Sequence, residues 1–201
     1  PTSSRRQRQM CIRDSSGISP IYEPGLDELI KKNFTAKRIS FTTNISRAIS
    51  SSDIIFICVG TPTRKGSIKV DLSFVYKCTK EILKFSKRKK IIVTKSTVPV
   101  GTGDQIEKIL KKKKKLFTVI SNPEFLREGE AIRDFRYPDR IVIGSNEKKA
   151  FNIMRKLYAP LTNKGSKFFT TSRRGAELIK YASNAFLATK ITFINELANL
   201  C

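Results

Sequence analysis

The sequence contains no histidine and no tryptophan among its 201 residues. The lack of histidine excludes a Ser-His-Asp triad, a Cys-His dyad and any zinc site built on imidazole ligands. Long hydrophobic runs are also absent, because the longest purely apolar stretch, residues 54–59, is far shorter than the roughly 20 residues that span a bilayer. If the protein is an enzyme, its acids, bases and nucleophiles are therefore Glu, Asp, Lys, Tyr or Cys.

Cysteine is scarce, and its spacing argues against a metal site. Cys11, Cys58, Cys78 and Cys201 form no Cys-x-x-Cys pair, so we predict free thiols in a reducing compartment and no bound metal. The basic residues 5–8 are not followed by an apolar segment long enough for a secretory signal. We therefore expect a cytoplasmic protein with no membrane partner.

Acidic residues are few, with 17 Asp and Glu against 40 Lys and Arg, which gives a formal net charge of +23. Such an excess suggests an anionic partner, and a basic nucleic-acid-binding module is the competing hypothesis. The two densest basic runs, residues 87–90 and 111–115, contain no aromatic residues that could stack on bases. Both fall at predicted helix C-termini, where cations complement the helix dipole, so we expect no specific nucleic-acid partner.

Residues 1–16 differ from the remainder of the chain, being polar, basic and without periodicity. We predict that they are disordered. The phrase QMCIRDS, residues 9–15, resembles translated sequencing-adaptor read-through, which predicts a non-native origin. The hydrophobic fraction of 39% nevertheless indicates a globular core for the rest of the chain.

From residue 18 onward, short apolar runs alternate with amphipathic stretches. The predicted strands are residues 53–59, 90–95, 116–120, 140–144 and 167–170, and residues 38–42 also look extended. The predicted helices are residues 24–32, 72–85, 105–114, 128–135 and 148–158, and a long one that Ser172 can cap and that runs to the end. This alternation is typical of an α/β fold with a doubly wound parallel sheet covered on both faces.

The last helix carries an apolar seam, because Ile179, Phe186, Phe193 and Leu200 recur every seven residues. Such a seam needs a partner surface. The spacing is equally compatible with packing on the same domain and with a subunit interface.

Three predicted strands end in polar loops, namely residues 59–63 (VGTPT), 95–99 (KSTVP) and 121–128 (SNPEFLRE). Ligands of open parallel sheets bind at the carboxyl ends of the strands. Each loop has a proline that fixes the backbone, together with hydroxyl or amide groups that can contact phosphate or ribose. We therefore expect the loops to converge on one crevice, although the sequence contains no complete G-x-G-x-x-G dinucleotide fingerprint.

Two pairs of polar residues are spaced i, i+4. A helical start would place the Glu124 and Glu128 carboxylates on one side, as a general base or a substrate-holding pair, although a solvated acidic pair is the more common arrangement. In the last helix, Lys180 could stabilise a developing oxyanion with Asn184 donating beside it, and a surface lysine is the alternative.

Five motifs stand in order along the chain: YEPGLDELI at 22–30, FICVGTPT at 56–63, KSTVPVGT at 95–102, SNPEFLREGEAIRDFRYPDRIVIG at 121–144 and AELIKYASNAFLATKITFINELANLC at 176–201. Together they resemble the UDP-glucose/GDP-mannose dehydrogenase family, and residues 122–144 are most similar to its UDP-glucose members. The resemblance implies an incomplete Rossmann-like NAD-binding domain at 17–171. It also implies that residues 172–201 begin a long central helix in a dimerisation domain, and hence a homo-oligomer.

Members of this family oxidise the C6 alcohol of a nucleotide sugar to a carboxylate in two NAD-dependent steps, through a thioester on a catalytic cysteine. That chemistry suits a chain without histidine. The resemblance therefore implies NAD as cofactor, a UDP-sugar as substrate, and the oxidation of UDP-glucose to UDP-glucuronate. GDP-mannose and UDP-N-acetylmannosamine dehydrogenases are the alternatives.

The resemblance also implies site residues. The implied cofactor contacts are Val59, Gly60, Thr61, Pro62, Thr63, Ser96, Thr97, Val98 and Glu128. The implied substrate contacts are Glu124, Phe125, Leu126, Arg127, Glu128, Lys180, Tyr181, Ala182, Ser183 and Asn184. Glu124 is the implied acid/base of thioester hydrolysis, Thr97 helps hold the catalytic water, and Lys180 and Asn184 stabilise the oxyanion.

Two departures from the family pattern lead to a further expectation. The first strand with its glycine-rich NAD loop is missing, as is the acidic residue that holds the adenosine ribose. The nucleophilic cysteine belongs to a downstream domain, and neither Cys58, Cys78 nor Cys201 matches it. We therefore expect the 201-residue chain to be an incomplete and inactive piece of a dehydrogenase.

Overall fold

The computed structural model describes residues 19, 21–64 and 66–200. The predictions of disorder and of a non-native origin for residues 1–16 lie outside these residues. Within them, no helix is both long enough and apolar enough to cross a membrane.

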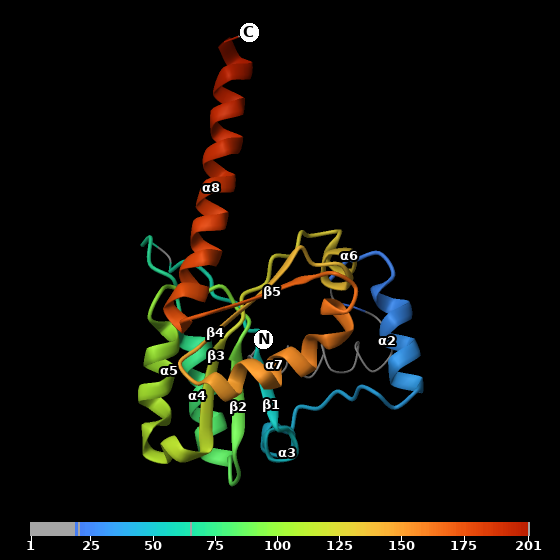
Figure 1. Cartoon of the computed structure of the whole chain (residues 1–201), viewed down its shortest axis with the longest axis vertical. Helices are drawn as coiled ribbons and strands as arrows, with labels where there is room; N and C mark the ends of the chain where they lie inside the picture. Colours follow the sequence, from blue (N-terminus) through green and yellow to red (C-terminus); the bar gives the residue numbers. More distant parts are fainter. Residues whose placement is uncertain (1–18, 20, 65, 201) are drawn as a thin grey trace.

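A five-stranded sheet forms the centre of the molecule (Figure 1). In spatial order its strands are β1 (Ile54–Ile57), β2 (Lys90–Thr94), β3 (Phe117–Ser121), β4 (Arg140–Ser145) and β5 (Lys167–Thr171). The first three strands run parallel, and so do β4 and β5, whereas β3 and β4 pair antiparallel. The α/β prediction is confirmed, and the sheet is mixed rather than wholly parallel. The reversal arises because the connection from β3 to β4 holds only a six-residue helix and does not carry the chain back to the opposite edge.

The helices agree closely with the sequence-based expectation. They are α2 (Leu26–Thr35), α3 (Ile45–Ser51), α4 (Ser73–Phe85), α5 (Thr102–Leu110) continued by the 3-10 helix η1 (Lys111–Leu116), α6 (Ala131–Arg136), α7 (Lys148–Thr162) and α8 (Arg173–Leu200). The predicted cap of the last helix is confirmed, because the Gly175 N–H donates to Ser172 Oγ at 3.0 Å.

Two local predictions were incomplete or wrong. Residues 38–42, expected to be extended, form no strand, because no other described strand pairs with them. Helix α3 was not predicted, since its serine-rich sequence is too short to show an apolar repeat. It is held by Asn44, whose side chain accepts the Arg47 N–H at 2.9 Å, and by the burial of Ile49.

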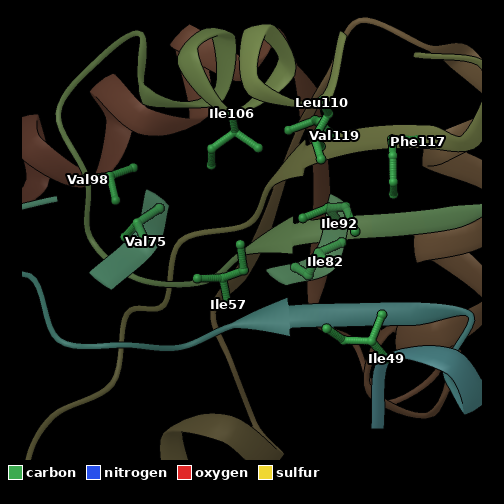
Figure 2. Packing of buried hydrophobic residues seen from close by; sticks show 10 residues of the cluster. All are labelled: Ile49, Ile57, Val75, Ile82, Ile92, Val98, Ile106, Leu110, Phe117 and Val119. Carbon is green, nitrogen blue, oxygen red and sulfur yellow. The ribbon is translucent and has the colours of Figure 1, made fainter. Parts of the chain in front are cut away.

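Both faces of the sheet are covered by apolar side chains. Ile92 and Val93 are neighbours on β2 and point to opposite faces, and both are fully buried. Figure 2 shows the first cluster, in which Ile92 lies among Ile82 of α4 and Ile106 and Leu110 of α5. The second cluster contains Val93 and packs against α7 through Ala150, Met154 and Tyr158. Burial on both faces is what the continuous apolar runs of the predicted strands require.

Helix α8 contacts the sheet only through its first turns. A Cβ at Gly144 of β4 would lie 2.6 Å from the Cβ of Ala176, so this glycine permits close packing of helix on strand. Beyond residue 183 the side chains of α8 are exposed, and in Figure 1 this half of the helix extends away from the rest of the molecule. The predicted seam follows this division, since Ile179 is half-buried whereas Phe186, Phe193 and Leu200 are exposed.

Candidate active site

The loops that follow β1 and β2 are bound to each other by their own hydroxyl groups. Thr61 Oγ1 donates to the Thr97 carbonyl at 2.8 Å, and Ser96 Oγ donates to the Val59 carbonyl at 2.6 Å. These bonds occupy the two hydroxyls with protein partners and fix the distance between the loops. The predicted cofactor contacts of the two segments therefore lie side by side at the carboxyl edge of the sheet.

The loop after β3 joins the same edge through Asn122, which is almost completely buried. Its backbone N–H donates to the Thr94 carbonyl at 2.9 Å. Its side chain donates to the Val142 carbonyl at 3.0 Å and accepts from the Tyr158 hydroxyl at 2.6 Å. Asn122 thus fixes the start of this loop against β2, β4 and α7. The three loops lie at one edge of the sheet as predicted, but the shared hollow is lined by the loops after β2 and β3, through Thr97 and Pro123, together with Lys180. The loop after β1 is bonded to the Thr97 loop and does not line this hollow.

The central feature of the site is an ion pair between Lys180 and Glu124, whose Nζ and Oε1 atoms lie 3.2 Å apart. Lys180 is 8% exposed, which is unusual for lysine unless it is paired. The other Glu124 oxygen, Oε2, accepts the Leu126 N–H at 2.7 Å. The structure therefore brings together two predicted catalytic residues that come from the β3–α6 loop and from α8.

Phe125 lies between two cations. The Lys180 Nζ stands 5.3 Å from its ring centre and the Arg140 guanidinium carbon 4.3 Å from it, so both form cation–π contacts. Arg140 also donates to Ser183 Oγ at 3.4 Å, which links β4 to α8. Arg140 was not among the predicted site residues. Its position in the RIVIG strand sequence pointed to the sheet and not to a ligand.

The expectation that Glu124 and Glu128 share a helix face is wrong. Residues 122–127 are not helical, and α6 begins only at Ala131. The carboxylate of Glu124 bonds the backbone two residues ahead, which holds the segment open, and Glu128 lies exposed in the following turn. The two carboxylates therefore occupy different environments.

Arg127 and the YEPG motif hold the outer part of this loop. The backbone and side chain of Arg127 donate to Asp134 at 2.6–3.0 Å, and this guanidinium lowers the pKa of the Asp134 carboxyl to about 2. The Gly129 and Ile132 N–H groups donate to Glu23 at 3.0 and 3.4 Å. Glu23 belongs to the YEPG motif, and nothing in the sequence indicates that its partners lie more than a hundred residues away.

The remaining predicted residues vary in exposure. Asn184 is exposed one helical turn beyond Lys180, Tyr181 and Ser183 are half-buried, and Ala182 is exposed. The side chain of Val98 is buried in the first core cluster, so only its backbone is placed to meet a ligand.

A cleft of about 610 Å³ opens beside the ion pair. Its lining includes the cations Lys95, Arg127, Arg133 and Arg140 and the anions Glu124, Asp134 and Asp139, together with Phe125, Phe135, Tyr137 and Tyr158. Burial lowers the pKa of Lys95 and raises that of Tyr158 to about 12. A lining of cations, carboxylates, hydroxyl groups and aromatic rings suits a polar ligand.

The loop after β1 also has room for a ligand. A Cβ at Gly60 would meet no atom within 4 Å, and the flanking Pro62 and Thr63 are exposed. The backbone of residues 59–63 is therefore accessible from solvent at the edge where the loops meet. Among the described residues, no group of three or more acidic or cysteine side chains is arranged to hold a metal ion.

Comparison with known proteins identifies the family. The NAD-binding domain of the UDP-glucose/GDP-mannose dehydrogenase family matches residues 12–162, and the central domain of the same family matches residues 174–201. The chain belongs to this family. The predictions of a Rossmann-like α/β fold and of NAD as cofactor are thereby confirmed.

Relatives named as UDP-glucose 6-dehydrogenases cover nearly the whole chain. That of Rhizobium meliloti (strain 1021) is 51% identical over 189 residues, covering 92% of this chain and 43% of the relative. That of Pseudomonas aeruginosa PAO1 is 43% identical over 202 residues, covering 98% of this chain and 44% of the relative. The chain thus spans less than half the length of the dehydrogenases that it matches.

Solved structures of the family share the fold. A UDP-glucose dehydrogenase from the hyperthermophilic archaeon Pyrobaculum islandicum superposes with a TM-score of 0.88 at 37% identity, covering 94% of this chain and 44% of that one. A GDP-mannose dehydrogenase from Pseudomonas aeruginosa, solved as a ternary complex, gives 0.86 at 35% identity, covering 94% and 44%. Members named for different nucleotide sugars therefore share this architecture.

Proposed function

We propose that this chain carries the cofactor-binding part and half of the sugar-oxidising site of an NAD-dependent UDP-glucose 6-dehydrogenase, which converts UDP-glucose to UDP-glucuronate. The observation that carries the proposal is the Lys180–Glu124 pair, which stands at the carboxyl edge of the sheet where the loops after β1, β2 and β3 meet. Relatives of about 50% identity that are named for this activity support the choice of substrate.

The proposed chemistry assigns separate tasks to the two members of the pair. Oxidation of an alcohol places negative charge on the sugar oxygen as its proton leaves, and the Lys180 ammonium stabilises that charge from a largely buried position. Asn184, one turn further along α8, donates a hydrogen bond to the same oxygen. Glu124 is the acid/base of thioester hydrolysis, and Thr97, which lines the same hollow as Lys180, helps hold the catalytic water.

The cofactor is held by the paired loops. NAD, when bound, supplies the acceptor for the hydride that leaves C6 in each of the two oxidations. We assign its contacts to the open backbone of residues 59–63, to Ser96 and Thr97, and to the backbone of Val98. We also assign to Glu128, which is exposed in the turn after Arg127, a contact with both cofactor and substrate.

The substrate lies along the β3–α6 loop and α8. We assign the substrate contacts to residues 124–128 and to residues 180–184. Phe125, fixed between Lys180 and Arg140, gives a rigid face for the sugar to pack against. The side chain and the backbone N–H of Arg127 are both bound to Asp134, so we assign Arg127 to shaping the loop that contacts the substrate.

The thioester nucleophile of the proposed reaction is not one of the described cysteines. Cys78 lies within α4, and partial burial raises its pKa. Cys58 follows the end of β1 instead of lying on the strand expected from the sequence, and desolvation raises the pKa of its thiol as well. A raised pKa disfavours the thiolate that attacks a carbonyl carbon. We therefore propose that neither Cys58 nor Cys78 is the nucleophile and, as the family resemblance implies, that residues 1–201 do not complete the reaction by themselves.

The test compares two proteins. The protein expressed from its natural gene is expected to release two NADH per UDP-glucose, followed by absorbance at 340 nm, with UDP-glucuronate as product. A polypeptide limited to residues 1–201 is expected to release none. NADH formation by the short polypeptide would refute the cysteine assignment, and failure of the natural protein to oxidise any nucleotide sugar would refute the proposed activity.

The same assay decides among nucleotide sugars. UDP-glucose is expected to give the highest kcat/KM, with GDP-mannose and UDP-N-acetylmannosamine as the competing substrates. A higher value for GDP-mannose would reassign the protein to that branch of the family, to which the Pseudomonas aeruginosa structure also belongs.

The division of the chain and its assembly are also proposals. We propose that residues 17–171 form the partial cofactor domain and that residues 172–201 begin a dimerisation domain. The exposed Phe186, Phe193 and Leu200 of α8 support a dimer formed through this helix in a cytoplasmic enzyme. Light scattering of the natural protein is expected to give a multiple of the protomer mass. Replacing Phe186 and Phe193 together with serine is expected to shift that mass toward one protomer, and an unchanged mass would place the interface elsewhere.

A further inference from the structure

Glu177 of α8 is buried without a cationic partner. It is 3% exposed, and no ion pair among the described residues includes it. Burial raises its pKa, although hydrogen bonds from Gly103, Gly101 and Ser121 oppose the shift. A buried carboxylate is tolerated where hydrogen bonds replace its hydration, so the donors around Glu177 identify the segments that it holds together.

The carboxylate of Glu177 receives three hydrogen bonds from two segments of the site. Oε2 accepts the Gly101 N–H at 2.6 Å, and Oε1 accepts the Gly103 N–H at 2.8 Å. Oε1 also accepts from Ser121 Oγ, at 3.3 Å, at the end of β3. The first two donors stand at the start of α5, directly after the loop that holds Ser96–Val98, and the third precedes the loop that holds Glu124.

The residues around Glu177 bring α8 close to the start of α5. A Cβ at Gly103 would lie 3.1 Å from Glu177 Oε1, so a larger residue would press on the carboxylate. One turn earlier on α8, the buried Arg173 donates to Asp104 at 2.8 Å and to Glu107 at 2.6 Å, both on α5. Helix α8 is thus fixed against α5 by two charged side chains on one face, and Lys180 follows on the next turn.

We propose that Glu177 is a positioning residue that fixes Lys180 relative to the Thr97 loop and to the start of the Glu124 loop. This inference rests on the proposed function for the roles of Lys180 and Thr97. A neutral amide cannot replace the carboxylate, because all three partners of Glu177 are donors and glutamine offers one acceptor oxygen. In Glu177→Gln, one N–H of the α5 start therefore faces another donor, and the loop and α8 lose their common anchor.

The test uses the protein expressed from its natural gene and two measurements. Glu177→Gln is expected to lower kcat for NADH formation by about 10- to 100-fold while the KM for UDP-glucose changes less than about threefold, because reacting groups are misplaced and not removed. Amide hydrogen exchange at Gly101 and Gly103 is expected to accelerate at least about tenfold. Gly103→Ala, which adds a methyl group close to Glu177 Oε1, is expected to reproduce both the lower kcat and the faster exchange.

Leu110→Ala is the control for a purely structural effect. Leu110 is buried at the opposite end of α5, so its truncation destabilises the same helix without touching Glu177. Its kcat is expected to stay within about twofold of the unaltered protein, assayed below its melting temperature. Equal losses of kcat in Leu110→Ala and Glu177→Gln, or unchanged exchange in Glu177→Gln, would overturn the inference. If the natural protein oxidises no nucleotide sugar, the proposed function fails, and the exchange rates alone then decide whether Glu177 anchors the loop.

Discussion

Replacing Lys180 with methionine is expected to lower kcat for NADH formation from UDP-glucose by about 10²- to 10³-fold in the protein expressed from its natural gene. Methionine keeps an unbranched apolar stem against Phe125 but removes the ammonium 3.2 Å from Glu124. The charge that develops on the substrate oxygen is then left without its buried cation. Initial rates at saturating UDP-glucose and NAD measure the effect.

Lys190→Met provides the matched control on the same helix. Lys190 is exposed, and its ammonium lies 5.7 Å from the Phe186 ring, far along α8 from the site. Its kcat is expected to remain within about twofold, since exposed cation–π contacts contribute little. A Lys180→Met enzyme that retained most of its kcat would show that the ion pair is structural and that another group stabilises the oxyanion.

Ile92→Ala is expected to lower the free energy of unfolding by about 2–5 kcal/mol. Ile92 is fully buried on the central β2 strand, among the side chains that Figure 2 displays around it. Removing three methyl or methylene carbons leaves a cavity that the rigid sheet cannot close. Urea denaturation followed by circular dichroism gives the change directly.

The same substitution at an exposed isoleucine is the control for the effect of burial. Ile68 is 98% exposed in the loop between β1 and α4, and Ile68→Ala is expected to change stability by less than about 0.5 kcal/mol. Comparable losses in the two variants would indicate that the described core does not determine stability.

The elements of this fold were predictable where burial produces a strong pattern. The apolar runs around Ile92 and Ile143 marked central strands, and the helices between them followed from amphipathic spacing. The direction of β4 was not predictable, because reversal depends on the path of the β3–α6 loop and leaves no mark on the strand itself. Helix α3 was missed because a single buried side chain, Ile49, gives no periodicity.

The site was predictable in outline and not in its contacts. The polar loops predicted a site at the carboxyl edge of the sheet, and the family resemblance indicated Glu124 and Lys180 as members of that site. The i, i+4 spacing of Glu124 and Glu128 wrongly predicted a shared helix face. The Glu124 side chain bonds the backbone two residues ahead, and such a bond competes with helix formation. Asn122, Arg140 and Glu177 went unrecognised since their partners come from other segments, and only tertiary packing reveals them.

The antiparallel run of β4 has a consequence for engineering. Because β4 runs antiparallel to β3 and ends beside Ile120, the turn from β4 into α7 continues along β3 toward its amino end, where Thr118 Oγ1 donates to Glu147 at 3.0 Å. The Lys180–Glu124 pair lies at the carboxyl edge. The exposed Asn146 in this turn is therefore a candidate insertion point for a peptide tag, because it lies in none of the loops 59–63, 95–99 and 121–128.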